Sequence, residues 1–290
     1  MLDFASTTSD PTLKNIGGIQ MEPTLSIVIP IYNEVTSLKE LLLQVVGVEI
    51  GMKKELILVD DFSTDGTRDI LKEIEAIQEK SDEIHQYVST AQIHPNENAV
   101  PNSERQEQTG STESVSQISA KVFYHDVNKG KGATLRTGFQ HITGEITLIQ
   151  DADLEYDPKD YPKLLQPILA GDADVVYGSR FMEGRQTGLL RSYLANQFLT
   201  TLANIVNGTR LTDMETCYKV IRTSILKEIS LYSDRFGFEP EITAKLAKRK
   251  CKIVEVPISY RGRDYHEGKT VSWKDGVAAI FHILRFRFFS

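Results

Sequence analysis

Two aspartates separated by one residue, Asp151 and Asp153, are the strongest candidates for chemistry in this sequence. They follow a largely apolar run, residues 145–150, that has the length of a buried strand. In an extended backbone, side chains two residues apart point to the same side, so both carboxylates can face one cation. Mg²⁺ and Mn²⁺ prefer oxygen ligands and are often shared with substrate phosphates. The pair therefore predicts a divalent-cation site, with a simple polar cap after the strand as the alternative.

A second acidic pair, Asp60 and Asp61, ends the apolar run of residues 55–60. A carboxylate at the end of a strand can accept hydrogen bonds from ribose hydroxyls or from the edge of a base. Aspartates also form turns and helix caps, so a purely structural role is the competing interpretation. The sequence alone leaves both roles open for this pair.

A loop rich in glycine and lysine, residues 128–132 with the sequence NKGKG, precedes a predicted helix. Glycines allow close approach, and the positive end of a helix favours an anion, so Lys131 is a candidate ligand for a donor phosphate. The spacing is not that of a Walker A motif, and a flexible basic loop is the alternative.

Two arginines follow the next part of the chain, Arg180 after a predicted strand and Arg191 after a loop that contains glycines. A guanidinium can bind a phosphate with two parallel hydrogen bonds, so both are candidate phosphate ligands. For Arg191 a surface salt bridge is an equal alternative.

Apolar runs and helical periodicity predict the elements that position these residues. Strands alternate with helices up to residue 180, which is typical of a mostly parallel sheet with helices on both faces. In such α/β sheets, ligands bind beyond the carboxyl ends of the strands, where the polar clusters fall. The predicted strands are residues 25–30, 55–60, 121–124, 145–150 and 174–178, and the predicted helices are about 34–48, 63–79, 131–142 and 158–169.

Composition divides the chain into four parts. Residues 1–22 are polar and without pattern, which predicts a flexible tail, and residues 23–270 form the α/β domain. Within that domain, residues 80–119 are rich in Ser, Gln, Glu, Asn and Thr, which predicts a disordered insertion. Residues 271–290 mix aromatic and basic side chains and predict a helix that lies on an anionic membrane, or a terminal helix packed on the domain.

Charge and cysteine content exclude several classes of protein. The net charge is −7, and no base-stacking motif is present, so nucleic-acid binding is not expected. The two cysteines form no metal-binding motif and no disulfide framework. The sequence shows no signal peptide and no apolar run long enough to cross a bilayer, so we expect a cytoplasmic protein that can bind a membrane peripherally.

Six segments appear in an order that resembles the family 2 glycosyltransferases, and among them the dolichyl- and polyprenyl-phosphate mannose or glucose synthases. The resemblance covers about residues 24–270 without the insertion. The segments are 30–34 (PIYNE), 59–67 (VDDFSTDGT), 128–133 (NKGKGA), 150–155 (QDADLE), 178–180 (GSR) and 213–219 (DMETCYK). The sequence departs from the family at Cys217, where relatives often carry glycine, and in the insertion.

The resemblance implies a GT-A fold, an inverting transfer and a divalent cation, Mg²⁺ or Mn²⁺. It also assigns roles by position. The donor nucleotide sugar would be bound by Pro30, Tyr32, Glu34, Asp60, Asp61, Lys131, Gln150 and Asp151, the metal by Asp151 and Asp153, and the acceptor phosphate by Arg180, Arg191 and Lys219.

The expected reaction moves a hexose from UDP-glucose or GDP-mannose to a polyprenyl or dolichyl phosphate, with Asp153, Asp213 and Arg180 as catalytic residues. A sugar or protein hydroxyl is the alternative acceptor, and Asp213 is then the first candidate base. A nucleotidyltransferase would need a glycine-rich stretch that residues 25–34 lack. A non-catalytic nucleotide-sugar-binding protein would have no need of Asp151 and Asp153.

Overall fold

The computed structural model describes residues 14–16, 19–21, 24–78, 118–184, 190–262 and 273–289 of the 290-residue chain. Most of the predicted tail and of the predicted insertion therefore lies outside the described residues. Within the expected tail, strands β1 (Lys14–Ile16) and β2 (Ile19–Met21) pair as a short antiparallel hairpin, which the sequence did not predict.

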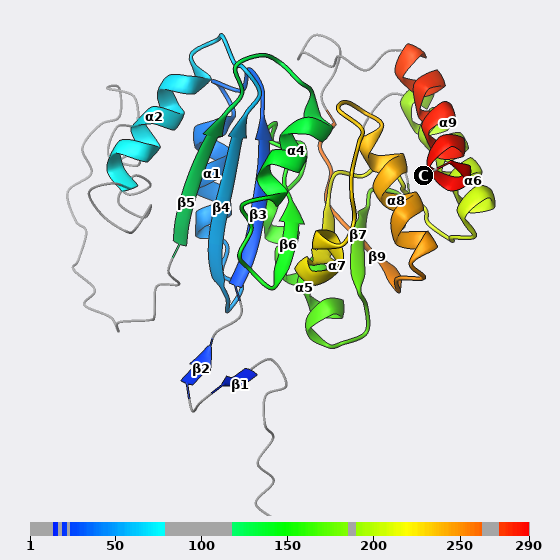
Figure 1. The fold of residues 1–290 in the computed structure, drawn as a ribbon, viewed down its shortest axis with the longest axis horizontal. Coiled ribbons are helices and arrows are strands. Elements are labelled where there is room, and N and C mark those ends of the chain that lie inside the picture. Colours follow the sequence, from blue (N-terminus) through cyan, green and yellow to red (C-terminus); the bar gives the residue numbers. More distant parts are fainter. Residues whose placement is uncertain are drawn as a thin grey trace, which may run out of the picture.

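One seven-stranded sheet forms the centre of the molecule, in the order β5-β4-β3-β6-β8-β7-β9 (Figure 1). All neighbours are parallel except β8, which runs antiparallel to both β6 and β7. The predicted α/β class with a mostly parallel sheet is confirmed. The strands are β3 (Thr24–Ile31), β4 (Lys53–Asp60), β5 (Ile118–Tyr124), β6 (Ile146–Ile149), β7 (Val175–Ser179), β8 (Lys219–Arg222) and β9 (Ile253–Pro257).

The sequence predicted five of these strands and missed two, β8 and β9. Strand β5 begins at Ile118, earlier than predicted, so the last two residues assigned to the insertion belong to the sheet. The antiparallel strand β8 is only four residues long and begins with a lysine, so it lacks the continuous apolar run that identified the others.

Helices cover both faces of the sheet; α1 lies behind β3 and β4 in Figure 1, and α4 lies in front of them. Contact between α4 and the sheet is close because α4 carries Gly138, where an added Cβ would lie 2.4 Å from Val28 Cγ1. The helices are α1 (Leu38–Gly47), α2 (Thr67–Gln78), α4 (Lys131–Phe139), η1 (Pro158–Asp160), α5 (Tyr161–Leu169), α6 (Leu190–Asn207), α7 (Thr223–Lys227), α8 (Phe238–Lys248) and α9 (Trp273–Phe288).

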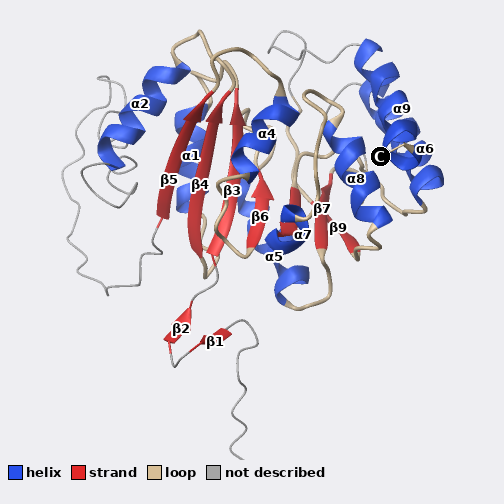
Figure 2. Ribbon diagram, viewed as in Figure 1, coloured by secondary structure: helices blue, strands red, loops and turns tan. Residues whose placement is uncertain are grey.

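The carboxyl ends of β3, β4 and β5 point the same way, toward the loops at the top of Figure 2. The chain adds β4 and β5 on one side of β3 and then places β6 on its other side. The loops that follow β3 and β6 therefore diverge at the same edge, which is where open α/β sheets bind ligands. We call this edge, formed by the loops that follow β3, β4, β6 and β7, the active edge.

The C-terminal helix α9 packs against α6 and α8 at the far end of the sheet (Figure 1). Its inner face is fully covered at Ile283 and Phe286, so α9 belongs to the folded domain. A helix, α9, occupies most of the stretch 271–290, and its packing on the domain is part of the fold.

Candidate active site

Asp151 lies directly beyond β6 and binds the side chain of Lys131. The Lys131 Nζ atom lies 2.9 Å from Asp151 Oδ1 and 3.0 Å from Oδ2, and 3.2 Å from Glu239 Oε1. Burial opposes the charged form of Lys131, but the neighbouring groups together, Asp151 foremost, raise the lysine pKa well above its ordinary value. One ammonium group thus joins the first turn of α4, the end of β6 and the first turn of α8.

The two oxygens of Asp151 already hold a cation, since the Lys131 ammonium lies against both of them. A metal ion would be held here by Asp151 and Asp153, both of which keep part of their surface exposed. In the described part of the chain, no group of three His, Cys, Asp or Glu side chains could hold a metal. Two carboxylates fit a hard cation that takes its other ligands from phosphates and water.

Gln150 lies beneath Asp151 and is fully buried. Its Oε1 accepts hydrogen bonds of 2.7 Å from both Tyr161 and Tyr218, and its Nε2 donates to the Asp151 carbonyl. The side chain predicted to bind the donor is therefore used within the protein, where it fixes the backbone that carries Asp151.

Arg180 and Asp213 form a buried ion pair at the end of β7. Asp213 Oδ2 lies 2.6 Å from Arg180 Nε, and Oδ1 lies 2.8 Å from Arg180 NH2. The Arg180 backbone N–H and the Asn196 amide also donate to Asp213, which has no exposed surface. Despite burial, Asp213 raises the Arg180 pKa well above its ordinary value. Asp213 therefore has the contacts of a residue that positions Arg180, and its predicted role as a base stays a prediction.

Tyr260 connects Arg180 to the loop that carries the two aspartates. The Arg180 guanidinium lies 5.0 Å from the Tyr260 ring centroid, and the Tyr260 hydroxyl donates to Glu155 Oε2 at 2.9 Å. Arg180 keeps 13% of its side chain exposed. Arg180 and the acidic loop after β6 are thus connected through Tyr260 at the active edge.

Lys219 is fully buried, although the sequence predicted that it binds the acceptor phosphate. Its ammonium donates to the carbonyls of Met214 and Thr216 and lies 4.6 Å from the Tyr177 ring centroid. Burial lowers the pKa of Lys219. These contacts hold the segment before β8 against the sheet. In the structure Lys219 therefore stabilises the fold.

The NKGKG loop binds an anion that belongs to the protein, the carboxylate of Asp61. The backbone N–H groups of Lys129 and Gly130 donate to Asp61 at 2.8 and 2.7 Å, and His125 Nδ1 lies 2.8 Å away. An added Cβ at Gly132 would lie 2.1 Å from the Ser233 carbonyl oxygen. The glycines therefore admit the neighbouring backbone, and Asp61, which is almost fully buried, orders the loop instead of facing a ligand.

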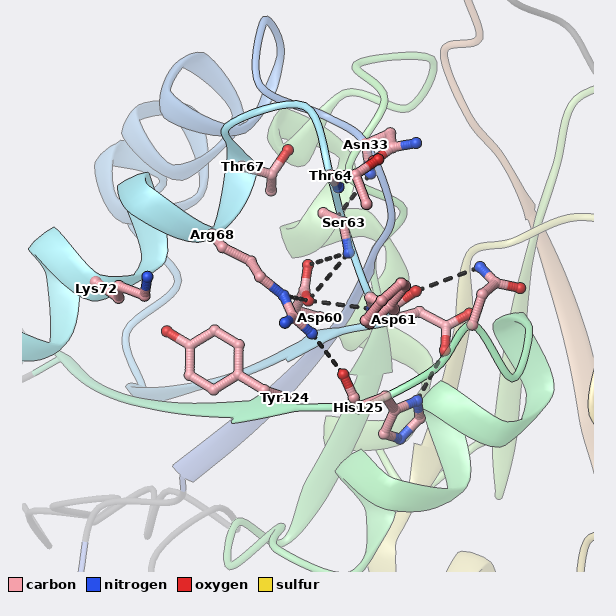
Figure 3. A network of polar contacts seen from close by, with 12 residues as sticks. Asn33, Asp60, Asp61, Ser63, Thr64, Thr67, Arg68, Lys72, Tyr124 and His125 are labelled. Carbon is pink, nitrogen blue, oxygen red and sulfur yellow. Dashed lines mark hydrogen bonds and ion pairs between the residues drawn. The ribbon is translucent and has the colours of Figure 1, made fainter.

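Asp60 has no exposed surface either and is surrounded by donors (Figure 3). Its Oδ2 accepts from the backbone N–H groups of Phe62 and Ser63 at 3.1 and 3.2 Å and lies 2.6 Å from Arg68 Nε. Nucleotide binding by Asp60 stays a prediction, since the structure shows this carboxylate engaged within its own loop.

The end of β3 and the loop that follows it carry the other predicted donor ligands. Tyr32 is half exposed, while Pro30 and Glu34 are partly buried. The Glu34 backbone N–H donates to Thr67 Oγ1 at 2.9 Å, which ties this loop to the start of α2. Tyr32 is therefore the most open of these three side chains at the active edge.

A model of the family described as Glycosyl transferase family 2 matches residues 26–91 and 108–230, which is more than half of the chain. The chain belongs to glycosyl transferase family 2. The predicted resemblance to this family is thereby confirmed.

Two relatives of this family 2 chain are transferases with a lipid phosphate in their names. It is 26% identical over 247 residues to the undecaprenyl-phosphate 4-deoxy-4-formamido-L-arabinose transferase of Edwardsiella ictaluri, covering 84% of this chain and 62% of the relative. It is 24% identical over 258 residues to the dolichol-phosphate mannosyltransferase of Pyrococcus furiosus, covering 85% and 60%. The chain thus spans about three fifths of the length of these curated relatives.

A solved structure supports the fold of this family 2 glycosyltransferase. The glucosyl-3-phosphoglycerate synthase of Mycobacterium tuberculosis, in complex with Mn²⁺, UDP and glucosyl-3-phosphoglycerate, matches with a TM-score of 0.59. The match covers 91% of this chain and 80% of that one at 17% identity. The expected GT-A fold is confirmed.

Glu239, like Tyr260 and Glu155, is a residue of this candidate site that the sequence analysis missed. It lies in the first turn of α8, where an acidic residue is stabilised by the positive end of the helix dipole. A glutamate at this position is common, so the sequence did not single it out. Its Oε2 atom is buried without a hydrogen-bond partner. Arg191 lies in the first turn of α6, but its side chain is outside the described residues, so its predicted role stays a prediction.

Proposed function

We propose that this family 2 glycosyltransferase moves a hexose, with inversion, from UDP-glucose or GDP-mannose to a polyprenyl or dolichyl phosphate. The observation that carries the proposal is the Arg180 guanidinium, fixed by Asp213 and linked through Tyr260 to the loop of Asp151 and Asp153. A cation that would bind the acceptor phosphate is thus linked to the loop of an acidic pair that would bind a metal ion. The named acceptors of the two relatives support a lipid phosphate.

A phosphate acceptor removes the need for a general base. Its second pKa is about 6, so near pH 7 most of it is a dianion that carries no proton to remove. An acceptor oxygen would attack the anomeric carbon from the side opposite the leaving group, and the bond to the nucleoside diphosphate would break with its electron pair. This assigns positioning of the phosphate to Arg180 and leaves Asp213 as the residue that orients Arg180.

The leaving diphosphate gains negative charge, and cations at the active edge would stabilise it. A divalent ion bound by Asp151 and Asp153 would supply Lewis-acid stabilisation of that charge. The Lys131 ammonium, which lies against Asp151 and Glu239, would bind a donor phosphate from the first turn of α4. Glu239 forms a second ion pair with the same Lys131 ammonium.

Measurement of nucleoside diphosphate release tests this function directly. UDP-glucose and GDP-mannose are each incubated with Mn²⁺ or Mg²⁺, with and without a short polyprenyl phosphate. We expect release that depends on the lipid phosphate and disappears in Asp153→Ala. The control is Asp172→Ala, an exposed aspartate in the turn between α5 and β7, which should retain full activity.

Two outcomes would refute parts of the proposal. Release that is indifferent to the lipid phosphate but increases with a sugar or protein hydroxyl would replace the acceptor and keep the transferase. Full activity of Asp153→Ala would remove the metal site from the mechanism.

Binding to a membrane would bring the enzyme to a lipid acceptor. Helices α6 and α9 provide a protein surface suited to such binding. Both helices carry exposed apolar side chains, and basic residues occupy the last turn of α9. Such a surface, apolar with flanking cations, suits the interface of an anionic bilayer. The exposed residues of this α6/α9 surface are Leu190, Leu194, Phe198 and Ile205 on α6, and Val277, Phe281, Leu284 and Phe288 on α9. Among the described residues, no helix combines the length and apolar character needed to cross a membrane.

Vesicle flotation tests the α6/α9 surface. We expect the protein to float with vesicles that contain phosphatidylglycerol, and the double variant Phe281→Asp/Phe288→Asp to remain in solution. Point variants are preferable to removal of α9. Removal would also take away the buried side chains of Ile283 and Phe286 and leave the domain core uncovered. Val127→Asp, an equally exposed position outside α6 and α9, is the control, and equal loss in both variants would refute the assignment.

A further inference from the structure

Phe62 holds a backbone conformation that its side chain disfavours, yet its ring remains exposed. Its φ angle is 67°, in the left-handed region, and 39% of the residue is accessible to solvent. For a bulky residue this conformation is strained, and it persists only where the surroundings impose it. Strain of this kind clusters at ligand-binding sites, so an exposed aromatic ring held in this way requires an explanation.

The loop around Phe62 is fixed by hydrogen bonds on both sides (Figure 3). The Phe62 backbone N–H donates to Asp60 Oδ2 at 3.1 Å. The Asn33 N–H donates to Ser63 Oγ, and the Thr64 N–H donates to Asn33 Oδ1, each at 2.9 Å. The loop after β4 is therefore bound to the loop after β3, and Phe62 cannot relax without breaking these bonds.

The Phe62 ring is supported from one side by Arg68. The guanidinium lies 5.2 Å from the Phe62 ring centroid and 5.6 Å from that of Tyr124. Two further contacts fix Arg68, a 2.6 Å ion pair with Asp60 and a hydrogen bond to the His125 carbonyl (Figure 3). An aromatic ring with a fixed cation beside it and solvent next to it is a rigid platform for another planar group.

We propose that Phe62 is the stacking platform for the base of the nucleotide donor. The inference rests on the proposed function, since it requires a nucleotide sugar. Phe62 follows β4 at the active edge, next to the loop of the exposed Tyr32, where an open α/β sheet binds its ligand. Stacking does not discriminate between bases, because every base has a flat face, so the platform serves uridine and guanosine alike.

Phe62→Asn separates a ligand platform from a structural role. Asparagine adopts positive φ readily, so the variant relieves the backbone and removes only the ring. We expect a melting temperature that is unchanged or raised, together with a roughly 5- to 150-fold weaker affinity for UDP or GDP, as measured for loss of a base–aromatic stack. Phe62→Trp should retain the affinity. Titration calorimetry with UDP and with GDP, each with Mn²⁺, measures it.

The control is Tyr232→Asn, which removes a more exposed aromatic ring elsewhere on the surface and should leave the affinity unchanged. Wild-type affinity in Phe62→Asn would overturn the platform and leave the proposed function intact. A fall in melting temperature of several degrees, with no recovery of affinity in Phe62→Trp, would also overturn it in favour of a structural role. A wild-type protein that binds neither nucleotide would overturn the proposed function and the platform together.

Discussion

Replacement of Asp213 by asparagine would leave the Arg180 guanidinium buried without its counter-charge. Asp213 has no exposed surface and accepts three hydrogen bonds from Arg180, at 2.6, 2.8 and 3.1 Å. Removal of one partner from a buried ion pair costs about 3–5 kcal/mol. Asparagine keeps the shape and one acceptor, but its amide turns two donors toward the Arg180 and Asn196 donors. We therefore expect a loss of about 3 kcal/mol in the free energy of unfolding.

Urea unfolding measures this loss. At an m value of about 3 kcal/mol per molar, the midpoint should fall by about 1 M. A double-mutant cycle with Arg180→Gln identifies the source, because the second substitution should cost little once the ion pair is already broken. Single variants that each cost less than about 1 kcal/mol and add within about 0.5 kcal/mol would show that the two residues are independent. That result would refute Asp213 as the residue that orients Arg180.

Two further predictions concern packing and pH. Gly132→Ala should destabilise the fold by about 3 kcal/mol in urea unfolding, because the added Cβ would lie 2.1 Å from the Ser233 carbonyl, whereas Gly47→Ala meets no atom within 4 Å and should be neutral or slightly stabilising. Equal effects of the two would contradict this reasoning. Burial, reinforced by Glu239, raises the Glu215 pKa to about 8. The folded state then binds more protons than the unfolded state between about pH 4.5 and 8, so stability should fall as the pH rises through this range. Glu215→Gln should flatten that slope, and an unchanged slope in thermal melts would contradict the assignment.

The sequence predicted five strands of the sheet, β3 to β7, for a definite physical reason. Strands that are buried on both faces are continuous apolar runs, and Asp60 and Asp151 interrupt such runs at the point where the chain leaves the core. The divalent-cation site expected from the spacing of Asp151 and Asp153 stays a prediction, and the structure shows a lysine against Asp151. That lysine, Lys131, was predicted to bind a phosphate, and both roles depend on the same ammonium.

Contacts between residues far apart in the chain were not predictable. Asp61 and Gly130 are joined by a 2.7 Å hydrogen bond, and only the folded chain shows that the basic loop already has an anion. The glycines of that loop were expected to admit a ligand, whereas they admit the backbone at Ser233. A buried lysine such as Lys219 resembles a ligand in sequence, because its carbonyl partners carry no sequence signal.

The connection between α2 and β5 leaves and enters the fold on the side opposite the active edge. Helix α2 starts just after the carboxyl end of β4 and returns to Gln78, and β5 begins again at Ile118 at the amino ends of the parallel strands. The two points of attachment, Gln78 and Ile118, therefore lie away from the loops that form the active edge. This junction is therefore the place to install a fluorophore, an affinity tag or a second domain, so that enzyme and membrane can be followed together without disturbing turnover.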